Sequence, residues 1–322
     1  MSADANLTIT KDPIEFGLGL DAGGTATRWA LVNKNSEVLE QGLVRGLTGL
    51  LMETPEGRSE LNEVLHRIAT QAFGARIVVK SKLHCYAGFT GLPDDARLFH
   101  AQCATALDLT PSQLTLDSDI ALTHSANFRP GEGIVVYAGT GSYASFLDAE
   151  GTLHRTGARG GILDDGGSGF WIARKALSHV WRCEDERPGQ WTQSDMARAL
   201  FDQLGGSDWS HTRQFVYGQS NAQMRGRMGV LATAVGASAD TDATANKILI
   251  EAGLELARLG NILCDQFGNH PIIFAGRVFN LHPIILETAR KNINRSNRNS
   301  VELSSINSIA VAAARIALKR LP

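Results

Sequence analysis

The stretch IEFGLGLDAGGTAT, residues 14–27, carries the pattern that decides the fold. Apolar side chains alternate with small or polar ones up to Leu20, which is the periodicity of a β-strand. Gly17 and Gly19 leave one face of that strand nearly bare, so that another backbone or a ligand can approach it closely. A second apolar run, RWALV at 28–32, follows the glycines. The pattern predicts two strands joined by a glycine-rich turn.

The segment that joins these strands, DAGGTAT at 21–27, has the composition of a phosphate-binding turn. Its glycines let the backbone come within hydrogen-bond distance of a phosphate, and its amide and hydroxyl groups are donors. A carboxylate at the strand end can hold Mg²⁺, which prefers few carboxylates and the oxygens of phosphate. The alternative is a plain β-hairpin with glycines in its turn. The candidate residues are Gly23, Gly24, Thr25 and Thr27 for phosphate and Asp21 for the metal.

The same pattern starts again after about 120 residues, as an internal duplication. Residues 133–157 repeat the order of strand, glycine turn, strand and strand. This second turn is not a P-loop, because no lysine follows it, and a strand rather than the helix of a dinucleotide site comes next. Alone it could be another plain hairpin, but two such turns predict a nucleotide whose phosphates are held between them. The second turn consists of Gly139, Thr140, Gly141 and Ser142.

The duplication also predicts the domain organisation, two α/β domains in one chain. We expect an N-terminal domain at 1–120, completed by a terminal helix at 305–322, and a second domain at 121–304. No low-complexity linker separates the two. The segment 183–244 is polar, contains two tryptophans and shows little periodicity, so the sequence yields no structure for it.

Two aspartates near the end of a predicted strand at 113–117 are candidates for a general base. Asp117 ends the strand, which is the position expected for a catalytic carboxylate. Asp119 fits better as the N-cap of a helix that begins near residue 120. We therefore expect Asp117 to accept a proton from an attacking hydroxyl and to contact the substrate, with an N-cap role as the alternative.

A third glycine cluster, RGGILDDGGSG at 159–169, opens an expected helix. Amides at a helix N-terminus favour anions or the hydroxyls of a sugar, although an ordinary cap on a glycine-rich loop is the alternative. Further along, Gly276 follows the strand PIIFAG, where a flat base could lie against backbone. On its own, a glycine at the end of a strand is weak evidence for a nucleotide site.

The composition excludes several classes of protein. The chain has 322 residues, 43% of them hydrophobic and 20% charged, with a formal net charge of -2. These values are typical of a globular protein and give no overall attraction to nucleic acid or an anionic membrane. The four cysteines are far apart and form no CxxC. Residues 1–13 lack the apolar region of a signal peptide, so we expect a cytoplasmic protein.

In their order along the chain, five motifs resemble those of the BadF/BadG/BcrA/BcrD ATPase family: DAGGTAT, LDSDIAL, VVYAGTGS, ILDDGGSGFWIARKAL and IIFAGRVF. That family includes N-acetylglucosamine kinase and glucosamine kinase, which have an actin-like, hexokinase-like fold of two duplicated α/β domains around a cleft. The resemblance implies that the two glycine turns are the phosphate loops and that Asp21 lies near Mg²⁺. It also implies a catalytic Asp117, a sugar contact at Asp165 and an adenosine motif at Gly276.

The chain departs from the family pattern at several positions. Ala26 stands where the family usually has lysine, and Leu116 replaces an asparagine. Arg159 stands where N-acetylglucosamine kinases usually have tryptophan, and Gly166 replaces a glutamate after Asp165. The last two changes look more like the glucosamine kinase branch. Phosphate and metal chemistry are therefore expected, with a substrate site that includes Arg159, Asp165 and Thr140.

The resemblance implies a function and its cofactors. We expect ATP-dependent, Mg²⁺-requiring phosphorylation of an amino sugar, N-acetylglucosamine or glucosamine, at the C6 hydroxyl, by a cytoplasmic homodimer. The alternatives are an ATP-hydrolysing switch that acts on a partner protein and a non-catalytic sugar sensor. The dehydratase activators of the family hold an iron–sulfur cluster with cysteines, and the scattered cysteines here do not support that reading.

Overall fold

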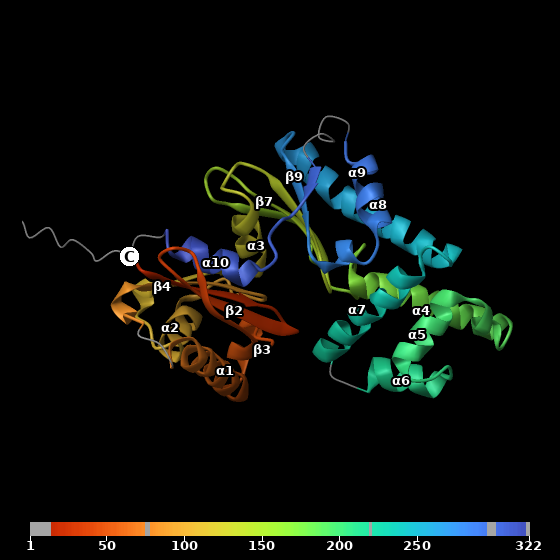
Figure 1. Ribbon diagram of the computed structural model, residues 1–322, viewed down its shortest axis with the longest axis horizontal. Coiled ribbons are helices and arrows are strands. Elements are labelled where there is room, and N and C mark those ends of the chain that lie inside the picture. The colour runs from red at the N-terminus through yellow and green to blue at the C-terminus, as the bar shows by residue number, and fades with distance from the viewer. Residues whose placement is uncertain (1–13, 75–77, 219–220, 295–300, 320–322) are drawn as a thin grey trace, which may run out of the picture. The chain divides into compact units, whose positions relative to one another are not determined.

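The chain folds into two compact units, Met1–Ala126 with Asn307–Pro322, and Asn127–Ile306. A computed structural model of the protein describes residues 14–74, 78–218, 221–294 and 301–319 (Figure 1). The N-terminal residues 1–13, on which the expected location depends, lie outside that part.

The first unit is built on a five-stranded mixed sheet with the strand order β3-β2-β1-β4-β5. Its first three strands are antiparallel, and β1, β4 and β5 run parallel. The hairpin expected from residues 14–32 is therefore present as β1 and β2, joined at the glycine turn. The strands are β1 (Phe16–Ala22), β2 (Ala26–Asn33), β3 (Val38–Arg45), β4 (Leu83–Phe89) and β5 (Leu114–Ser118).

Helices cover both faces of this sheet (Figure 1). Leu18 and Leu20 of β1 pack into one hydrophobic cluster with α1 (Pro55–Phe73) and α2 (Arg97–Ala106). The other face carries α10 (Ile309–Ala317), while α3 (Asp119–Asn127) follows β5. Short 3₁₀ helices are η1 (Gly49–Glu53), η2 (Lys80–Lys82) and η3 (Pro111–Gln113).

The bare face of β1 is occupied by the backbone of α10. A Cβ on Gly17 would lie 2.0 Å from the carbonyl oxygen of Ala314, and one on Gly19 would lie 2.0 Å from that of Ala310. Real Cβ atoms do not come this close, so only glycine lets the helix pack directly on the strand. The close approach expected from the sequence is thus made by a helix and not by a ligand.

The second unit repeats the same sheet connectivity in the order β10-β9-β6-β7-β8. As in the first sheet, two pairings are antiparallel, β6 with β7 and β7 with β8. The other two are parallel, β6 with β9 and β9 with β10. This shared topology confirms the internal duplication. The strands are β6 (Ile134–Ala138), β7 (Ser142–Leu147), β8 (Leu153–Gly157), β9 (Ile272–Ala275) and β10 (Val301–Leu303).

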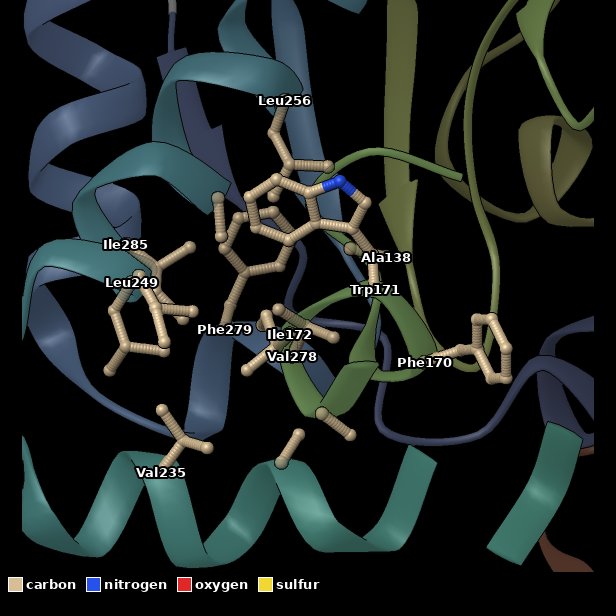
Figure 2. Packing of buried hydrophobic residues seen from close by; sticks show 14 of the residues in the cluster. Ala138, Phe170, Trp171, Ile172, Val235, Leu249, Leu256, Val278, Phe279 and Ile285 are labelled. Carbon is tan, nitrogen blue, oxygen red and sulfur yellow. The ribbon is translucent and has the colours of Figure 1, made fainter. Parts of the chain in front are cut away.

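Helices form most of the remainder of the second unit. The segment that the sequence left unassigned contributes three of them, α5, α6 and α7. Figure 2 shows part of the core, where Trp171 and Ile172 of α4 lie among side chains of α7 and α8. The elements are α4 (Gly169–Glu186), η4 (Gln190–Gln193), α5 (Asp195–Leu204), α6 (Trp209–Tyr217), α7 (Asn221–Ser238), α8 (Ala243–Phe267), η5 (Arg277–Asn280) and α9 (Pro283–Asn292).

Within the described ranges, no helix combines the length and the apolar composition that crossing a membrane requires.

Asp242 joins the starts of two helices in this unit. Its carboxylate caps α8 by accepting from Thr244 N at 2.9 Å and from Ala245 N at 3.2 Å. At the start of α5 it accepts from Ser194 Oγ at 2.6 Å and from Met196 N at 3.2 Å. Burial alone would raise the pKa of Asp242, but these hydrogen bonds together hold the pKa below its ordinary value. The ionised carboxylate therefore stabilises the fold.

Asp242→Ala should lower the free energy of unfolding by about 2–4 kcal/mol at neutral pH, because a helix cap and bonds to a charged acceptor are lost. A depressed folded-state pKa gives stability above the unfolded pKa, about 3.9, and loses it as the pH falls through the folded value. The difference from the native protein should accordingly shrink in acid. Urea unfolding at a series of pH values measures it. Asp202→Ala, at an exposed position of α5, should change stability by no more than about 0.5 kcal/mol.

Candidate functional site

The first glycine turn connects β1 to β2 and presents backbone at the surface of its unit. Gly23 N donates to Ala26 O at 3.2 Å, and Gly24 and Thr25 are exposed. Gly46 packs behind the turn, where a Cβ would lie only 2.3 Å from Gly24 O. The turn is therefore supported from inside, and the exposed amides and the hydroxyl of Thr25 are available to an anion.

Thr27 lies on the inner side of this turn. It is fully buried, and its hydroxyl oxygen accepts a hydrogen bond from Leu47 N at 3.1 Å. Leu47 follows Gly46, the residue that packs against the turn. The side chain of Thr27 thus holds Leu47 beside the turn, and its expected contact with phosphate stays a prediction.

Two carboxylates lie together at the carboxyl edge of the first sheet. Asp21 is near the end of β1, and Asp119 is the first residue of α3. Burial raises the pKa of Asp21, Arg28 opposes that shift, and the nearby charge of Asp119 adds to it. Thr90 connects the two segments, since its N donates to Ala22 O at 3.0 Å and its hydroxyl donates to Asp119 Oδ2 at 2.5 Å.

This carboxylate pair fits a Mg²⁺ ion. A cation would offset both the burial of Asp21 and its repulsion from Asp119. Mg²⁺ in phosphoryl-transfer sites is usually bound by one or two carboxylates together with the phosphates of the substrate. Among the described residues no group of three His, Cys, Asp or Glu side chains could hold a metal by itself. The arrangement therefore suits an ion that arrives with a nucleotide.

Asp117 has different surroundings from Asp119. It lies within β5, in register with Gly88 of β4, and Asp117 Oδ2 accepts a hydrogen bond from Tyr86 Oη at 3.0 Å. Tyr86 is fully buried in the cluster beneath α10. Asp117 is thus tied to a buried tyrosine, and Asp119 is the aspartate whose charge acts on Asp21.

The expected N-cap role of Asp119 belongs mainly to another residue. Ser118 Oγ accepts the hydrogen bond of Ala121 N at 3.1 Å, which is the bond an N-cap side chain makes. Asp119 Oδ1 accepts a hydrogen bond from the adjacent Ile120 N at 3.0 Å, which is not the bond that an N-cap side chain makes. Ser118, which was not among the residues predicted from the sequence, is therefore the better N-cap candidate.

The second glycine turn, between β6 and β7, is half-buried. Gly139 N donates to Gly141 O at 2.9 Å. Ser142 is almost fully buried, and its hydroxyl donates to Gly166 O at 2.7 Å. The second turn is thus bonded to the third glycine cluster, so the structure brings together two of the motifs that the sequence singled out.

Asp165 lies inside the second unit with an exposed fraction of 2%. Its backbone is left-handed, with φ of 60°. Burial raises the pKa of its carboxyl, and Arg225 and the amides of Gly160 and Ser142 oppose that shift. Arg225 Nη2 donates to Asp165 Oδ2 at 2.8 Å. By contrast, Arg159 is exposed. The sequence grouped Arg159 and Asp165 as sugar contacts, but their surroundings differ.

Gly276 lies beside the second turn. Its φ is +104°, and a Cβ would lie 2.3 Å from the carbonyl oxygen of Ala138, the residue before Gly139. Only glycine fits both the backbone conformation and this approach. The adenosine motif expected from the resemblance thus lies next to the second turn in the fold.

Known proteins are similar to this chain in sequence and in fold. The model of the BadF/BadG/BcrA/BcrD ATPase family matches residues 18–314. An N-acetylmuramic acid/N-acetylglucosamine kinase of Clostridium acetobutylicum is 27% identical over 179 residues, which cover 54% of this chain and 56% of that relative. The match therefore spans little more than half of the relative's length.

Solved structures agree over nearly the full chain. A candidate N-acetylglucosamine kinase of Chromobacterium violaceum is 22% identical, with a TM-score of 0.69, and the match covers 95% of this chain and 99% of that one. A ROK family glucokinase of Streptomyces griseus, bound to glucose and AMPPNP, is 17% identical, with a TM-score of 0.58 and coverage of 95% and 100%. These likenesses show the fold, which is the α/β actin-like ATPase fold that the resemblance implied. The match of the family model over residues 18–314 shows that the chain belongs to the BadF/BadG/BcrA/BcrD ATPase family.

Proposed function

We propose that this protein is an ATP-dependent sugar kinase that transfers the γ-phosphate of ATP to a hydroxyl of an amino sugar, N-acetylglucosamine or glucosamine, at C6. The observation that carries the proposal is the pair of adjacent carboxylates, Asp21 and Asp119, at the sheet edge that also holds the exposed turn. The Clostridium relative, named for kinase activity on N-acetylglucosamine, supports the substrate class.

The two glycine turns are proposed to bind the phosphates of ATP. In the first unit, the exposed backbone at Gly24 and Thr25 donates to phosphate oxygens, and Asp21 holds the Mg²⁺. In the second, the turn at 139–141 does the same, and Gly276 beside it is the adenosine contact that the family resemblance implies. A bound Mg²⁺ neutralises charge on the phosphates, which is most of what phosphoryl transfer requires beyond positioning.

We propose Asp119, in place of Asp117, as the general base. Its carboxylate is fixed by the hydroxyl of Thr90 and by its place at the start of α3. An ionised carboxylate accepts hydrogen bonds and can take up a proton from a sugar hydroxyl. Asp119 would orient that hydroxyl and accept its proton as the oxygen attacks the γ-phosphorus in line.

For the sugar itself, we propose contacts from Arg159 and Thr140. Arg159 is exposed on the third glycine cluster, and Thr140 is the central residue of the second turn. An arginine presents several donors in a fixed geometry, which suits hydroxyl or carbonyl oxygens. The family resemblance further leads us to propose a cytoplasmic homodimer whose partner is a small sugar, and not a nucleic acid or a membrane.

The test is ADP release measured with a panel of sugars. N-acetylglucosamine or glucosamine should increase the rate of ADP release by about tenfold or more over the sugar-free rate, because the sugar supplies the positioned nucleophile. Galactose serves as the comparison. An equal rate with every sugar and without sugar would contradict a kinase and would favour an ATP-hydrolysing switch that acts on a partner protein.

Removal of the metal gives a separate prediction. With excess EDTA, phosphorylation should fall by at least about 10²-fold, since the phosphate charges are then not neutralised. Added Mg²⁺ should restore the rate. A rate that is unchanged by the chelator would rule out the metal role assigned to Asp21.

A further inference from the structure

The second turn is held in place by a helix that the sequence pattern did not reveal. Arg225 lies on α7, within the segment 183–244, and donates from Nη2 to Asp165 Oδ2 at 2.8 Å. The exposed fraction is 42% for the arginine side chain and 2% for the aspartate. The pair therefore joins a partly exposed cation to a buried anion, across 60 residues of sequence.

The carboxylate of Asp165 is in direct contact with the second turn. The backbone amides of Ser142 and Gly160 oppose the rise in its pKa that burial causes. A Cβ on Gly141 would lie 3.0 Å from Asp165 Oδ2, so the carboxylate packs against the turn from behind. Arg225 and the second turn thus contact the same buried carboxylate inside the unit.

The same face of α7 contacts the turn at a second place. Gly229 is four residues after Arg225, so both lie on one side of the helix. A Cβ on Gly229 would lie 3.7 Å from both Cγ2 and Oγ1 of Thr140. The helix thus supports the middle of the turn directly and the end of the turn through Asp165.

We propose that Arg225 is a positioning residue for ATP binding, which acts through the carboxylate of Asp165 to hold the turn at 139–142 in its binding conformation. The inference rests on the proposed role of that turn in the kinase. It gives Asp165 a role as a support for the phosphate turn, beside the sugar contact that the family resemblance implies. The helical segment that contains α7 thereby gains a function in nucleotide binding.

The test is a set of variants on α7, with the ATP dissociation constant measured in the absence of sugar. Arg225→Gln should weaken ATP binding by about tenfold or more, because a charge-assisted hydrogen bond to a buried acceptor is lost. Arg225→Lys keeps the charge and should recover part of that loss. Arg227→Gln is the matched control, since its guanidinium lies 4.3 Å from the ring of Phe215 on α6, and it should leave ATP binding unchanged.

The kinetic constants separate positioning from a direct sugar contact. Arg225→Gln should raise the KM for ATP by more than the KM for the sugar. An unchanged ATP dissociation constant in Arg225→Gln, or a rise in the sugar KM alone, would overturn the inference. Thermal melts identify any variant that fails to fold, and Arg225→Lys then decides the matter. Because ATP binding is measured without sugar, the inference can fail or succeed independently of the kinase activity.

Discussion

Asp119→Asn should lower the kcat of sugar phosphorylation by about 10²–10⁴-fold, the usual contribution of a general base. Asparagine keeps the shape of the side chain and can still accept the hydrogen bond from the hydroxyl of Thr90. Its amide cannot take a proton from the sugar. The ATP dissociation constant should change little, because Asp21 and both glycine turns stay intact. Steady-state kinetics and nucleotide titration measure the two effects.

Asp117→Asn is the matched control for this prediction. Asparagine at 117 can still accept the hydrogen bond that Tyr86 Oη donates in β5. We therefore expect a loss in kcat of no more than about tenfold, far below that of a lost general base. The reverse result, with Asp117→Asn inactive and Asp119→Asn active, would return the catalytic role to the residue that the sequence first indicated.

Gly19→Ala should destabilise the protein by about 3 kcal/mol or more, at the upper end for overpacking. The added Cβ would lie 2.0 Å from Ala310 O, 2.3 Å from Ala314 N and 2.9 Å from the Cβ of Ala313. These are mostly backbone atoms of α10, so no side-chain rotation relieves the overlap. The helix would have to separate from β1, with loss of the packing on that face of the sheet. Urea unfolding measures the change.

Gly24→Ala is the control on the same hairpin. A Cβ there meets only Cγ2 of Thr48, at 3.6 Å, which is ordinary contact. Its free energy of unfolding should differ from that of the native protein by no more than about 0.5 kcal/mol. If Gly19→Ala were as stable as Gly24→Ala, then the close packing of α10 on β1 would be wrong.

The strand and turn pattern of this chain is local, and it could be predicted. Alternating apolar residues and the glycines at 17 and 19 gave both the first hairpin and the bare face of β1. The second hairpin repeats the same signals, which is why the duplication was visible without coordinates. In each case the residues that determine the structure are neighbours in the sequence.

The choice between Asp117 and Asp119 is not local. Both lie near the end of β5, and the deciding contacts come from Thr90, which follows β4, and from Asp21 on β1. These contacts exist only once three strands are assembled. Periodicity places the two aspartates but carries no information on which of them reaches Asp21.

The support of the second turn was also beyond the sequence pattern. Arg225 and Asp165 are separated by 60 residues, and the segment 183–244 has little apolar periodicity. Its helices do begin with readable caps, Ser194 for α5 and Asp208 for α6. A search for N-caps would have found these helices, but their contacts with the turn depend on tertiary packing.

The most direct test of the kinase proposal is ³¹P NMR of the native protein incubated with ATP, Mg²⁺ and either N-acetylglucosamine or glucosamine. We expect one sugar 6-phosphate for each ADP formed, with little inorganic phosphate. ADP accompanied by inorganic phosphate alone, with both sugars unmodified, would contradict the assignment of this protein as an amino-sugar kinase.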